Sequence, residues 1–498
     1  MNNIVRIEAK RMYMKIIFVF ANFIFFAITL FAEVRLPSIL GNGMVLQQKT
    51  QTNLWGWATS QKKITIVTSW NNRTYTGYSS FDGKWSIEVE TPEAGGPYTI
   101  TISDGQPIEL SDVLIGEVWV CAGQSNVQMP VKGFIGQPVI GSCDAIAMAS
   151  SKEKIRLLTV LRRENSELQE ECQSTSWLET TPSNVKEFSA VAYFFAKYIQ
   201  NILQVPVGII CSAAGGTNIE RWMNKNDYLA IYPDKSMDEV KNVRAGELYN
   251  TMIYPLHLFN IKGIIWYQGE SNVLNPHEYK QLFIRMVASW REKWALGEFP
   301  FYYVQIAPYQ YSDKQASPIG AAELRQAQLE AMTIIPNSGM VVTSDVGDAK
   351  HIHPADKPNV GKRLALWALA KTYNIPGIPY CGPIYKSAEI KGSKVILSFD
   401  YIDMGMTTYN QPLSGFELAG KNGIFYPAKA VFIGKKEKIE VYSDNVVEPV
   451  YVQLGFKNYM PLNLYSTYGL PASPFRIKIP SSVSYTHLRA HETEADLV

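Results

Sequence analysis

The sequence predicts an α/β fold in which a parallel sheet is covered by helices on both faces and flanked by two β regions. Three observations support this prediction. Residues 33–112 carry short alternating runs separated by turn signals, residues 113–375 alternate buried apolar runs with helical stretches, and residues 376–480 return to alternating runs. The chain has 498 residues, of which 46% are hydrophobic and 18% charged, so it can bury large cores and is not disordered.

Residues 1–32 have the pattern of a secretory signal peptide. Lys15 precedes an apolar run that ends at the small residue Ala32, and Met14 is an alternative start. We therefore expect export, to the periplasm or out of the cell, with no stable membrane insertion once the signal is removed. A retained N-terminal anchor is the alternative, although the run is slightly short for a spanning helix.

Residues 33–112 are expected to form a β-sandwich region. The predicted strands are 52–56, 63–69, 74–79, 85–90 and 98–103. Turn signals such as Phe81-Asp82-Gly83 separate them.

Residues 113–375 are expected to form the α/β domain. The predicted strands are 117–122, 155–161, 207–212, 263–268, 301–306 and 339–344, and the predicted helices are 189–203, 276–294, 321–333 and 359–372. Asn275 is a candidate cap before Pro276 at the first helical position. Ligands of such folds bind beyond the carboxyl ends of the strands.

Residues 376–480 are expected to form a second β region. Its predicted strands are 394–399, 415–418, 430–433, 439–443 and 449–454. The pattern leaves open whether the two β regions pack as one unit or as two. Residues 481–498 are polar and resemble a translated adapter tail, so we interpret them as non-native, with a native C-terminal helix as the alternative.

Net charge, glycine motifs and cysteine spacing argue against several classes of function. Lys and Arg number 47 against 45 Asp and Glu, a net charge of +2, which argues against a nucleic-acid binder. No phosphate-binding or dinucleotide glycine pattern follows a predicted strand, and we expect no cofactor. The five cysteines form no disulfide framework or zinc spacing, and buried free thiols are the favoured interpretation.

Three loops after predicted strands carry glycine and small polar residues. In the first, Gly123 allows a tight turn that exposes Ser125 at the strand end as a candidate nucleophile; an ordinary turn or helix cap is the alternative. The second contains Gly215-Gly216, whose backbone N–H groups can approach a substrate closely. The third, residues 266–272, places two amides and Glu270 at one strand end, and a structural role is favoured for Glu270.

The histidines narrow the choice of a general base. His351 and His353 follow the strand that ends near residue 344, where a base can face Ser125. Alternate residues of an extended segment face one way, so the pair is also a candidate metal site. No Cys, His and acid cluster completes such a site, and we expect no metal.

Together these loops resemble the SGNH-hydrolase superfamily and, more narrowly, the sialate O-acetylesterase family of carbohydrate esterases. The resemblance spans about residues 35–476. The matching segments are residues 44–47, 123–126, 215–217, 248–253, 266–272, 324–328, 352–354 with Lys357 and 361–365, and 469–476.

The resemblance implies a three-layer α/β/α hydrolase domain that removes acetyl groups from sugar hydroxyls. It matches Ser125 to the nucleophile and His353 to the base, and the N–H groups of Ser125 and Gly216 to oxyanion donors. A further oxyanion donor comes from the third loop as Gln268 or, ranked slightly lower, Asn272.

The acid of the triad is where this sequence departs from the family. An Asp two or three residues before the histidine is common there, but His351 and Lys350 occupy these places. Either Asp348, with Asp345 behind it, orients His353, or a backbone carbonyl does and leaves a Ser-His dyad.

The expected substrate is an O-acetylated sugar. Sialic acid is favoured, and acetylxylan or another polysaccharide is the alternative. Arg221, Trp222 and Arg325 are candidate contacts to a carboxylate or a sugar ring, although helix packing explains them equally well. A non-catalytic glycan-binding protein, using its aromatic-rich β regions, is the rival from a different class.

Overall fold

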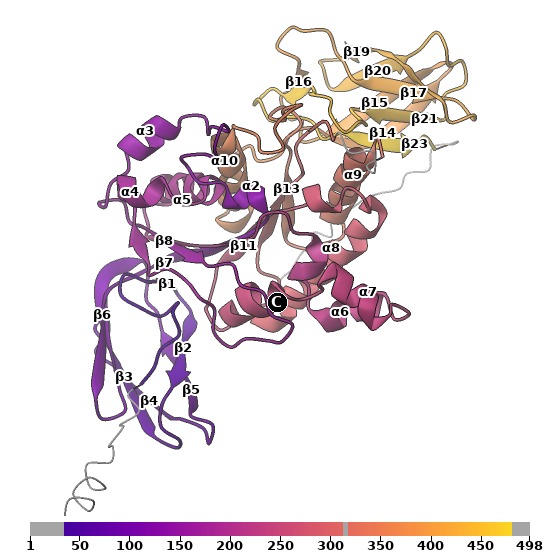
Figure 1. Cartoon of the computed structure of the whole chain (residues 1–498). Coiled ribbons are helices and arrows are strands. Elements are labelled where there is room, and N and C mark those ends of the chain that lie inside the picture. The colour runs from indigo at the N-terminus through magenta and orange to yellow at the C-terminus, as the bar shows by residue number, and fades with distance from the viewer. Residues whose placement is uncertain (1–33, 312–316, 481–498) are drawn as a thin grey trace, which may run out of the picture.

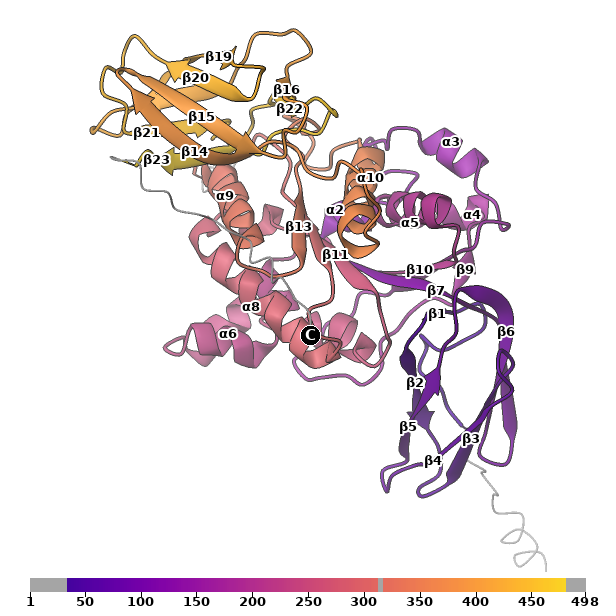
Figure 2. The same ribbon diagram turned by 180° about the vertical axis from the view of Figure 1, so that it is seen from behind.

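The computed structural model describes residues 34–311 and 317–480. The predicted signal segment and the predicted non-native tail lie outside these residues. The central α/β part lies between the two β regions, which sit at opposite ends of the molecule (Figure 1; Figure 2). The two β regions are therefore separate units, which the sequence pattern left open.

The N-terminal region consists of two β layers (Figure 1). In one, β2 (Gln51–Trp57) pairs with β5 (Lys84–Glu90); in the other, β3 (Lys63–Thr68) pairs with β4 (Thr74–Tyr78) and β6 (Gly95–Ser103). Every second side chain of β5 is buried, as the alternating sequence pattern predicts.

A single long strand, β7 (Pro107–Gly123), joins this region to the central sheet. Its first half pairs with β6, and β1 (Val45–Gln47) runs parallel to its middle. Its second half lies between β10 (Val207–Ala213) and β11 (Gly263–Tyr267). The sequence-predicted boundary between residues 112 and 113 thus falls inside a continuous strand.

The central sheet has the strand order β13-β12-β11-β7-β10-β8-β9. The strands from β13 to β8 are parallel, and the short β9 is antiparallel to β8. The outer strands are β8 (Ile155–Val160), β9 (Leu178–Glu179), β12 (Phe301–Val304) and β13 (Ser338–Val341). Because parallel strands share one direction, the loops after β7, β10 and β11 meet at the same edge.

Helices cover both faces of this sheet. Trp119 of β7 packs on Phe195 of α5 (Ala190–Leu203), and Trp266 of β11 packs on Trp290 of α8 (Pro276–Trp294). Trp266 is in register with Ala122, three residues from Trp119, so the two tryptophans point to opposite faces. The fold is therefore a three-layer α/β/α domain.

The other helices complete these layers. α10 (Lys357–Trp367) packs beside α5, and α9 (Gly320–Met332) packs beside α8 (Figure 2). The shorter helical elements are α2 (Ser125–Gln128), α3 (Ser142–Ala147), α4 (Pro182–Val185), α6 (Lys225–Ile231), α7 (Met237–Val243), η1 (Ile219–Trp222), η2 (Tyr249–Ile253), η3 (Tyr254–Leu256), η4 (Glu270–Asn272) and η5 (Ala368–Thr372). In the part of the chain that the structure describes, no helix is both long and apolar enough to span a membrane.

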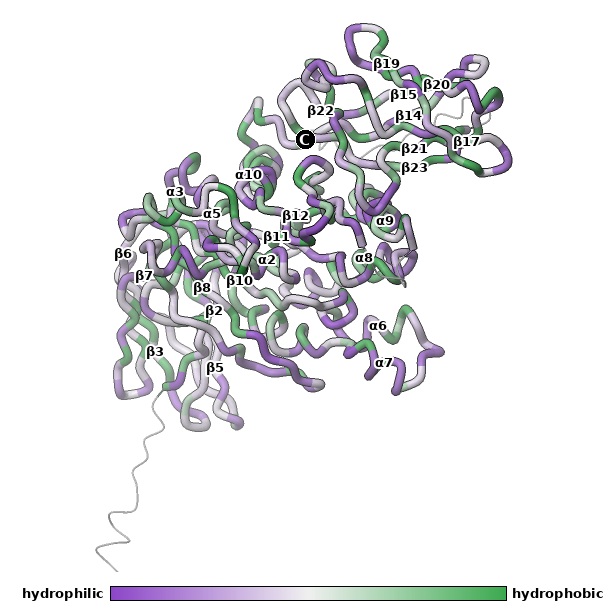
Figure 3. Tube along the Cα trace, turned by 45° about the horizontal axis from the view of Figure 1, so that its top comes forward, coloured by the Kyte–Doolittle hydropathy of each residue, from purple (hydrophilic) through white to green (hydrophobic). Residues whose placement is uncertain are grey.

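The C-terminal region contains antiparallel sheets. One has the order β14-β15-β20-β19 and the other β18-β17-β21-β23, with a small pair β16-β22. The strands are β14 (Ile384–Lys391), β15 (Lys394–Asp400), β16 (Met406–Thr407), β17 (Phe416–Ala419), β18 (Phe425–Pro427), β19 (Lys429–Ile433), β20 (Lys438–Tyr442), β21 (Tyr451–Leu454), β22 (Tyr465–Ser466) and β23 (Phe475–Lys478). Hydrophilic residues are frequent at the outer turns of this region (Figure 3).

The five cysteines are all free. Four are buried, as expected from the sequence, but Cys143 is exposed. Burial raises the pKa of Cys172 to about 11 and that of Cys211 to about 12, so these thiols are unreactive packing groups.

Candidate active site

Ser125 stands at the carboxyl end of β7, on a turn that only glycine permits. Gly123 has φ +145°, and a Cβ added there would lie 2.1 Å from the carbonyl oxygen of Tyr267. The chain therefore leaves the sheet sharply, and α2 begins at Ser125 itself. Among the described residues the N–H of Ser125 has no hydrogen-bond acceptor, which leaves it free to bind a ligand.

His353 meets Ser125 across 228 residues of sequence. Its Nε2 lies 2.8 Å from the Ser125 Oγ, and its ring packs edge-on against Phe134 at 5.2 Å between centroids. The two residues that the sequence analysis selected as nucleophile and base are thus in hydrogen-bond contact. Of the two candidate histidines, His351 is the exposed one.

The second ring nitrogen of His353 is held by an amide. Its Nδ1 lies 2.7 Å from the Oε1 of Gln137. An amide oxygen accepts and does not donate, so Nδ1 carries the proton and donates it to Gln137. Nε2 is then the unprotonated nitrogen, which can accept the Ser125 proton.

The group at this place is neither Asp348 nor a backbone carbonyl, the two partners that the sequence analysis allowed. The Oδ1 of Asp348 accepts the backbone N–H groups of Lys350 and His351, at 2.7 and 2.9 Å, and so closes a local turn. Asp345 pairs instead with Arg363, at 2.6 Å. Gln137 was missed because it lies in a loop more than two hundred residues upstream, where no sequence pattern marks it.

The imidazole of His353 is kept in its neutral form. Burial lowers its pKa to about 4, and the charges of Lys357 and His351 act in the same direction. A neutral imidazole is the form that can accept a proton from a hydroxyl group.

The second loop packs directly against Ser125. A Cβ added to Gly215 would lie 3.3 Å from the Ser125 Cβ. The Gly215 N–H donates to Gln128 Oε1 at 3.0 Å, and its carbonyl accepts from Arg162 Nη1 at 3.2 Å. The loop is fixed on both sides, while the exposed Gly216 N–H has no acceptor among the described residues.

The third loop is braced by its own amides. Gln268 Nε2 donates to the carbonyl of Thr217, at 3.1 Å, and to Asn272 Oδ1, at 2.7 Å. Both amide hydrogens of Gln268 are therefore used, whereas Asn272 Nδ2 donates once, to Glu220 at 3.0 Å. Of the two candidate donors, only Asn272 has an amide hydrogen left for a ligand, which favours it over Gln268.

The three candidate substrate contacts are buried, which favours the alternative that they serve packing. Arg221 pairs with Glu164 at 2.7 Å and with Glu247 at 3.3 Å, and Trp222 Nε1 donates to the Thr217 hydroxyl at 2.9 Å. Arg325 donates to backbone carbonyls of the C-terminal region. These side chains support the fold and are closed off from a ligand.

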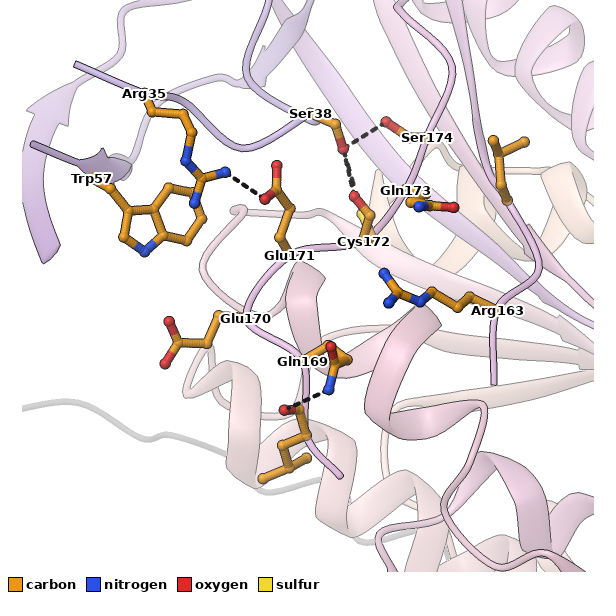
Figure 4. A pocket seen from close by; sticks show the side chains of 12 residues that line it. Arg35, Ser38, Trp57, Arg163, Gln169, Glu170, Glu171, Cys172, Gln173 and Ser174 are labelled. Carbon is orange, nitrogen blue, oxygen red and sulfur yellow. Dashed lines mark hydrogen bonds and ion pairs between the residues drawn. The ribbon is translucent and has the colours of Figure 1, made fainter. Parts of the chain in front are cut away.

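No cluster of three His, Cys, Asp or Glu side chains able to hold a metal occurs within residues 34–311 and 317–480. An open cavity of about 860 Å³ lies between the N-terminal region and the loop after β8. Arg35 stacks over Trp57 and pairs with Glu171 in its wall (Figure 4). Its lining includes neither Ser125 nor His353, so it is separate from this candidate pair.

A family model described as "Carbohydrate esterase, sialic acid-specific acetylesterase" matches residues 115–370, which is half of the chain and contains both Ser125 and His353. The chain belongs to this carbohydrate esterase family.

Other members of known identity agree with this assignment. Sialate O-acetylesterase of Mus musculus is 28% identical over 450 residues, covering 77% of this chain and 82% of the mouse protein. The Homo sapiens enzyme of the same name is 29% identical over 408 residues, covering 74% and 76%.

A solved structure extends the likeness to the whole architecture. The crystal structure of XAC1771, described as a novel carbohydrate acetylesterase from Xanthomonas citri, has 32% identity and a TM-score of 0.82. The match covers 89% of this chain and 99% of that one, so it includes the flanking β regions.

Proposed function

We propose that this carbohydrate esterase is a serine O-acetylesterase that releases acetate from O-acetylated sugars. The observation that carries the proposal is the hydrogen bond between Ser125 Oγ and His353 Nε2, 2.8 Å, at the edge where the three loops meet. The neutral imidazole and the hydrogen bond from its Nδ1 to Gln137 support the assignment of His353 as the base.

The reaction proceeds in two steps. His353 Nε2 takes the Ser125 proton as the Oγ attacks the acetyl carbonyl. The resulting oxyanion is bound by the N–H groups of Ser125 and Gly216, with Asn272 as a third donor. His353 then protonates the sugar oxygen as the C–O bond breaks, which leaves an acetyl-serine.

Water completes the cycle. His353 removes a proton from a water molecule, which attacks the acetyl-serine and forms a second oxyanion in the same place. Collapse of that intermediate releases acetate and returns the proton to Ser125. The sequence of steps uses this chain's own residues and requires no cofactor.

We assign O-acetylated sialic acid as the first substrate to test, because the mammalian relatives are named sialate O-acetylesterases. An acetylated polysaccharide such as acetylxylan is the second candidate, because the Xanthomonas relative is described only as a carbohydrate acetylesterase. The apolar run before residue 33 supports an exported enzyme, which cell fractionation would test.

Acetate release decides between these possibilities. Purified protein is given O-acetylated sialic acid and acetylated xylan in parallel, and p-nitrophenyl acetate serves as a general ester. Ser125→Ala should abolish turnover of all three while leaving the thermal unfolding midpoint unchanged. Turnover that survives in the folded variant would overturn the catalytic assignment, and no turnover by the wild type would favour a glycan-binding protein.

A further inference from the structure

A set of buried polar side chains lies behind the catalytic pair and has no part in the mechanism above. Lys357 and Asn126 are fully buried, and Glu270 is 5% exposed. Burying a cation or a carboxylate is costly unless the group is well bonded, so their presence calls for a physical reason.

Their contacts converge on the backbone carbonyls of the two residues on either side of His353. Lys357 Nζ donates to the carbonyl of Pro354 at 2.8 Å, directly after the histidine. Asn126 Nδ2 donates to the carbonyl of Ile352 at 3.2 Å, directly before it. The histidine is thus held by its neighbours on both sides.

The same side chains are joined to one another and to the nucleophile. Lys357 Nζ donates to Asn126 Oδ1 at 2.6 Å, and Asn126 Nδ2 also donates to Glu270 Oε1. Asn126 directly follows Ser125 in the chain. Its amide group therefore links the ammonium group of Lys357 and the carboxyl group of Glu270 to the residue next to the proposed nucleophile. Serine and histidine are therefore tied to a common scaffold.

We infer that Lys357 is a positioning residue for catalysis, which fixes His353 against Ser125 through Pro354 and Asn126. This inference rests on the proposed function. Lys357 touches no reacting atom in the mechanism, and its effect passes through the backbone on each side of the histidine and through its own charge.

The charge of Lys357 also acts on His353 directly. It is the second cause, after burial, of the lowered pKa of His353, and His351 is the third. The charged groups that act on Lys357 itself are Glu270 and Asp356, whose negative charges oppose the lowering of its pKa by burial. Removing the ammonium group therefore raises the pKa of His353 toward its ordinary value.

The test replaces Lys357 and measures both rate and pH dependence. Lys357→Met, with p-nitrophenyl acetate as substrate, should lower kcat by about 10²-fold, the scale of a small misplacement of a catalytic group. The acidic limb of kcat/KM should move to higher pH. Lys357→Arg retains the charge and should keep that limb closer to its wild-type position.

Lys362→Met is the matched control, because Lys362 lies on the same helix with an exposed side chain. It should leave kcat and the pH profile unchanged. If Lys357→Met does not fold, Lys357→Gln keeps an N–H donor without the charge and should show the same displacement of the acidic limb.

A folded Lys357→Met or Lys357→Gln variant with wild-type kcat and an unmoved acidic limb would overturn the inference. Ser125→Ala, assayed in parallel, separates this result from a failure of the proposed function. Activity lost with Ser125 but unaffected at Lys357 refutes only the positioning role, whereas activity retained without Ser125 refutes the mechanism itself.

Discussion

The partner of His353 is an amide oxygen, where a carboxylate was one of the two expectations. Gln137 Oε1, 2.7 Å from Nδ1, fixes the tautomer of the imidazole but adds no negative charge to stabilise the imidazolium. In the proposed mechanism Gln137 therefore orients the base but raises its pKa less than a carboxylate would.

Two substitutions of Gln137 separate these effects. Gln137→Leu removes the acceptor and should lower kcat by about 10²–10⁴-fold, because the imidazole loses its fixed tautomer. Gln137→Glu supplies a charge and should shift the acidic limb of kcat/KM to higher pH. Gln106→Leu, at an exposed position, is the control; normal kcat in Gln137→Leu would contradict the role of Gln137.

The lowered pKa of His353 predicts the pH dependence of the wild type. The base acts only when neutral, so kcat/KM should fall as the pH drops through about 4 and should be flat from there toward neutrality. Initial rates with a soluble acetyl ester between pH 3.5 and 8 would check this. An acidic limb near the ordinary histidine value of about 6.5 would contradict it.

Sequence patterns were sufficient for some site residues and not for others. Ser125 and the pair His351 and His353 were candidates because each follows a buried strand of a parallel sheet, and such strand ends meet at one edge. The family resemblance then favoured Ser125 as nucleophile and His353 as base. Gln137 could not be predicted from the sequence, because its loop has no periodic pattern. For Arg221 and Arg325 the sequence could not separate a ligand contact from a packing role, because the groups that bond them in the structure are distant in sequence.

At the scale of secondary structure, the turn between β7 and α2 depends on Gly123. Gly123→Ala would place its Cβ 2.1 Å from the Tyr267 carbonyl oxygen at a φ of +145°, so β7 or β11 must shift. We expect a loss of stability of more than about 2 kcal/mol and a large loss of esterase activity.

Gly297→Ala provides the comparison for that prediction. Gly297 also has a positive φ, +69°, but nothing lies within 4 Å of the added Cβ. Only backbone strain of about 1–2 kcal/mol is expected there, with activity intact. Denaturant unfolding of the two variants should rank them in this order, and equal losses would argue against the close contact at Gly123.

The observed ends of helices agree with the predicted ends where the sequence carries a strong local signal, such as a proline at the first helical position. α8 has the predicted bounds, residues 276–294, with Pro276 at its first position, although Asn275 makes no capping bond. The last predicted helix instead starts two residues earlier, at Lys357, because the Asp356 side chain accepts the Asn359 N–H at 3.1 Å. The predicted domain boundary between residues 112 and 113 lies within β7, because that strand takes part in both the N-terminal region and the central sheet.

At the scale of the whole molecule, the C-terminal β region is fastened to the α/β domain by buried polar contacts. Arg325 of α9 donates to the carbonyls of Lys457 and Asn458, and the Ser344 hydroxyl donates to the carbonyl of Ala472 at 2.9 Å. These contacts join segments more than a hundred residues apart.

Arg325→Met tests whether this residue serves structure or substrate. We expect a loss of about 2 kcal/mol in the free energy of unfolding, because the buried carbonyl of Asn458 and the partly buried carbonyl of Lys457 lose a charged donor. KM for acetylated sugars should not change. A rise in KM at unchanged stability would instead indicate that Arg325 contacts the substrate. Arg73→Met, on the exposed face of the N-terminal region, should alter neither quantity.

The continuity of β7 has a consequence for how this chain can be modified. β7 is 17 residues long; it pairs with β6 at its start and ends at Gly123, two residues before Ser125. The N-terminal β layers therefore cannot be exchanged for another domain without disturbing the central sheet. A graft or deletion made at residue 112 would interrupt β7, the strand that positions Ser125.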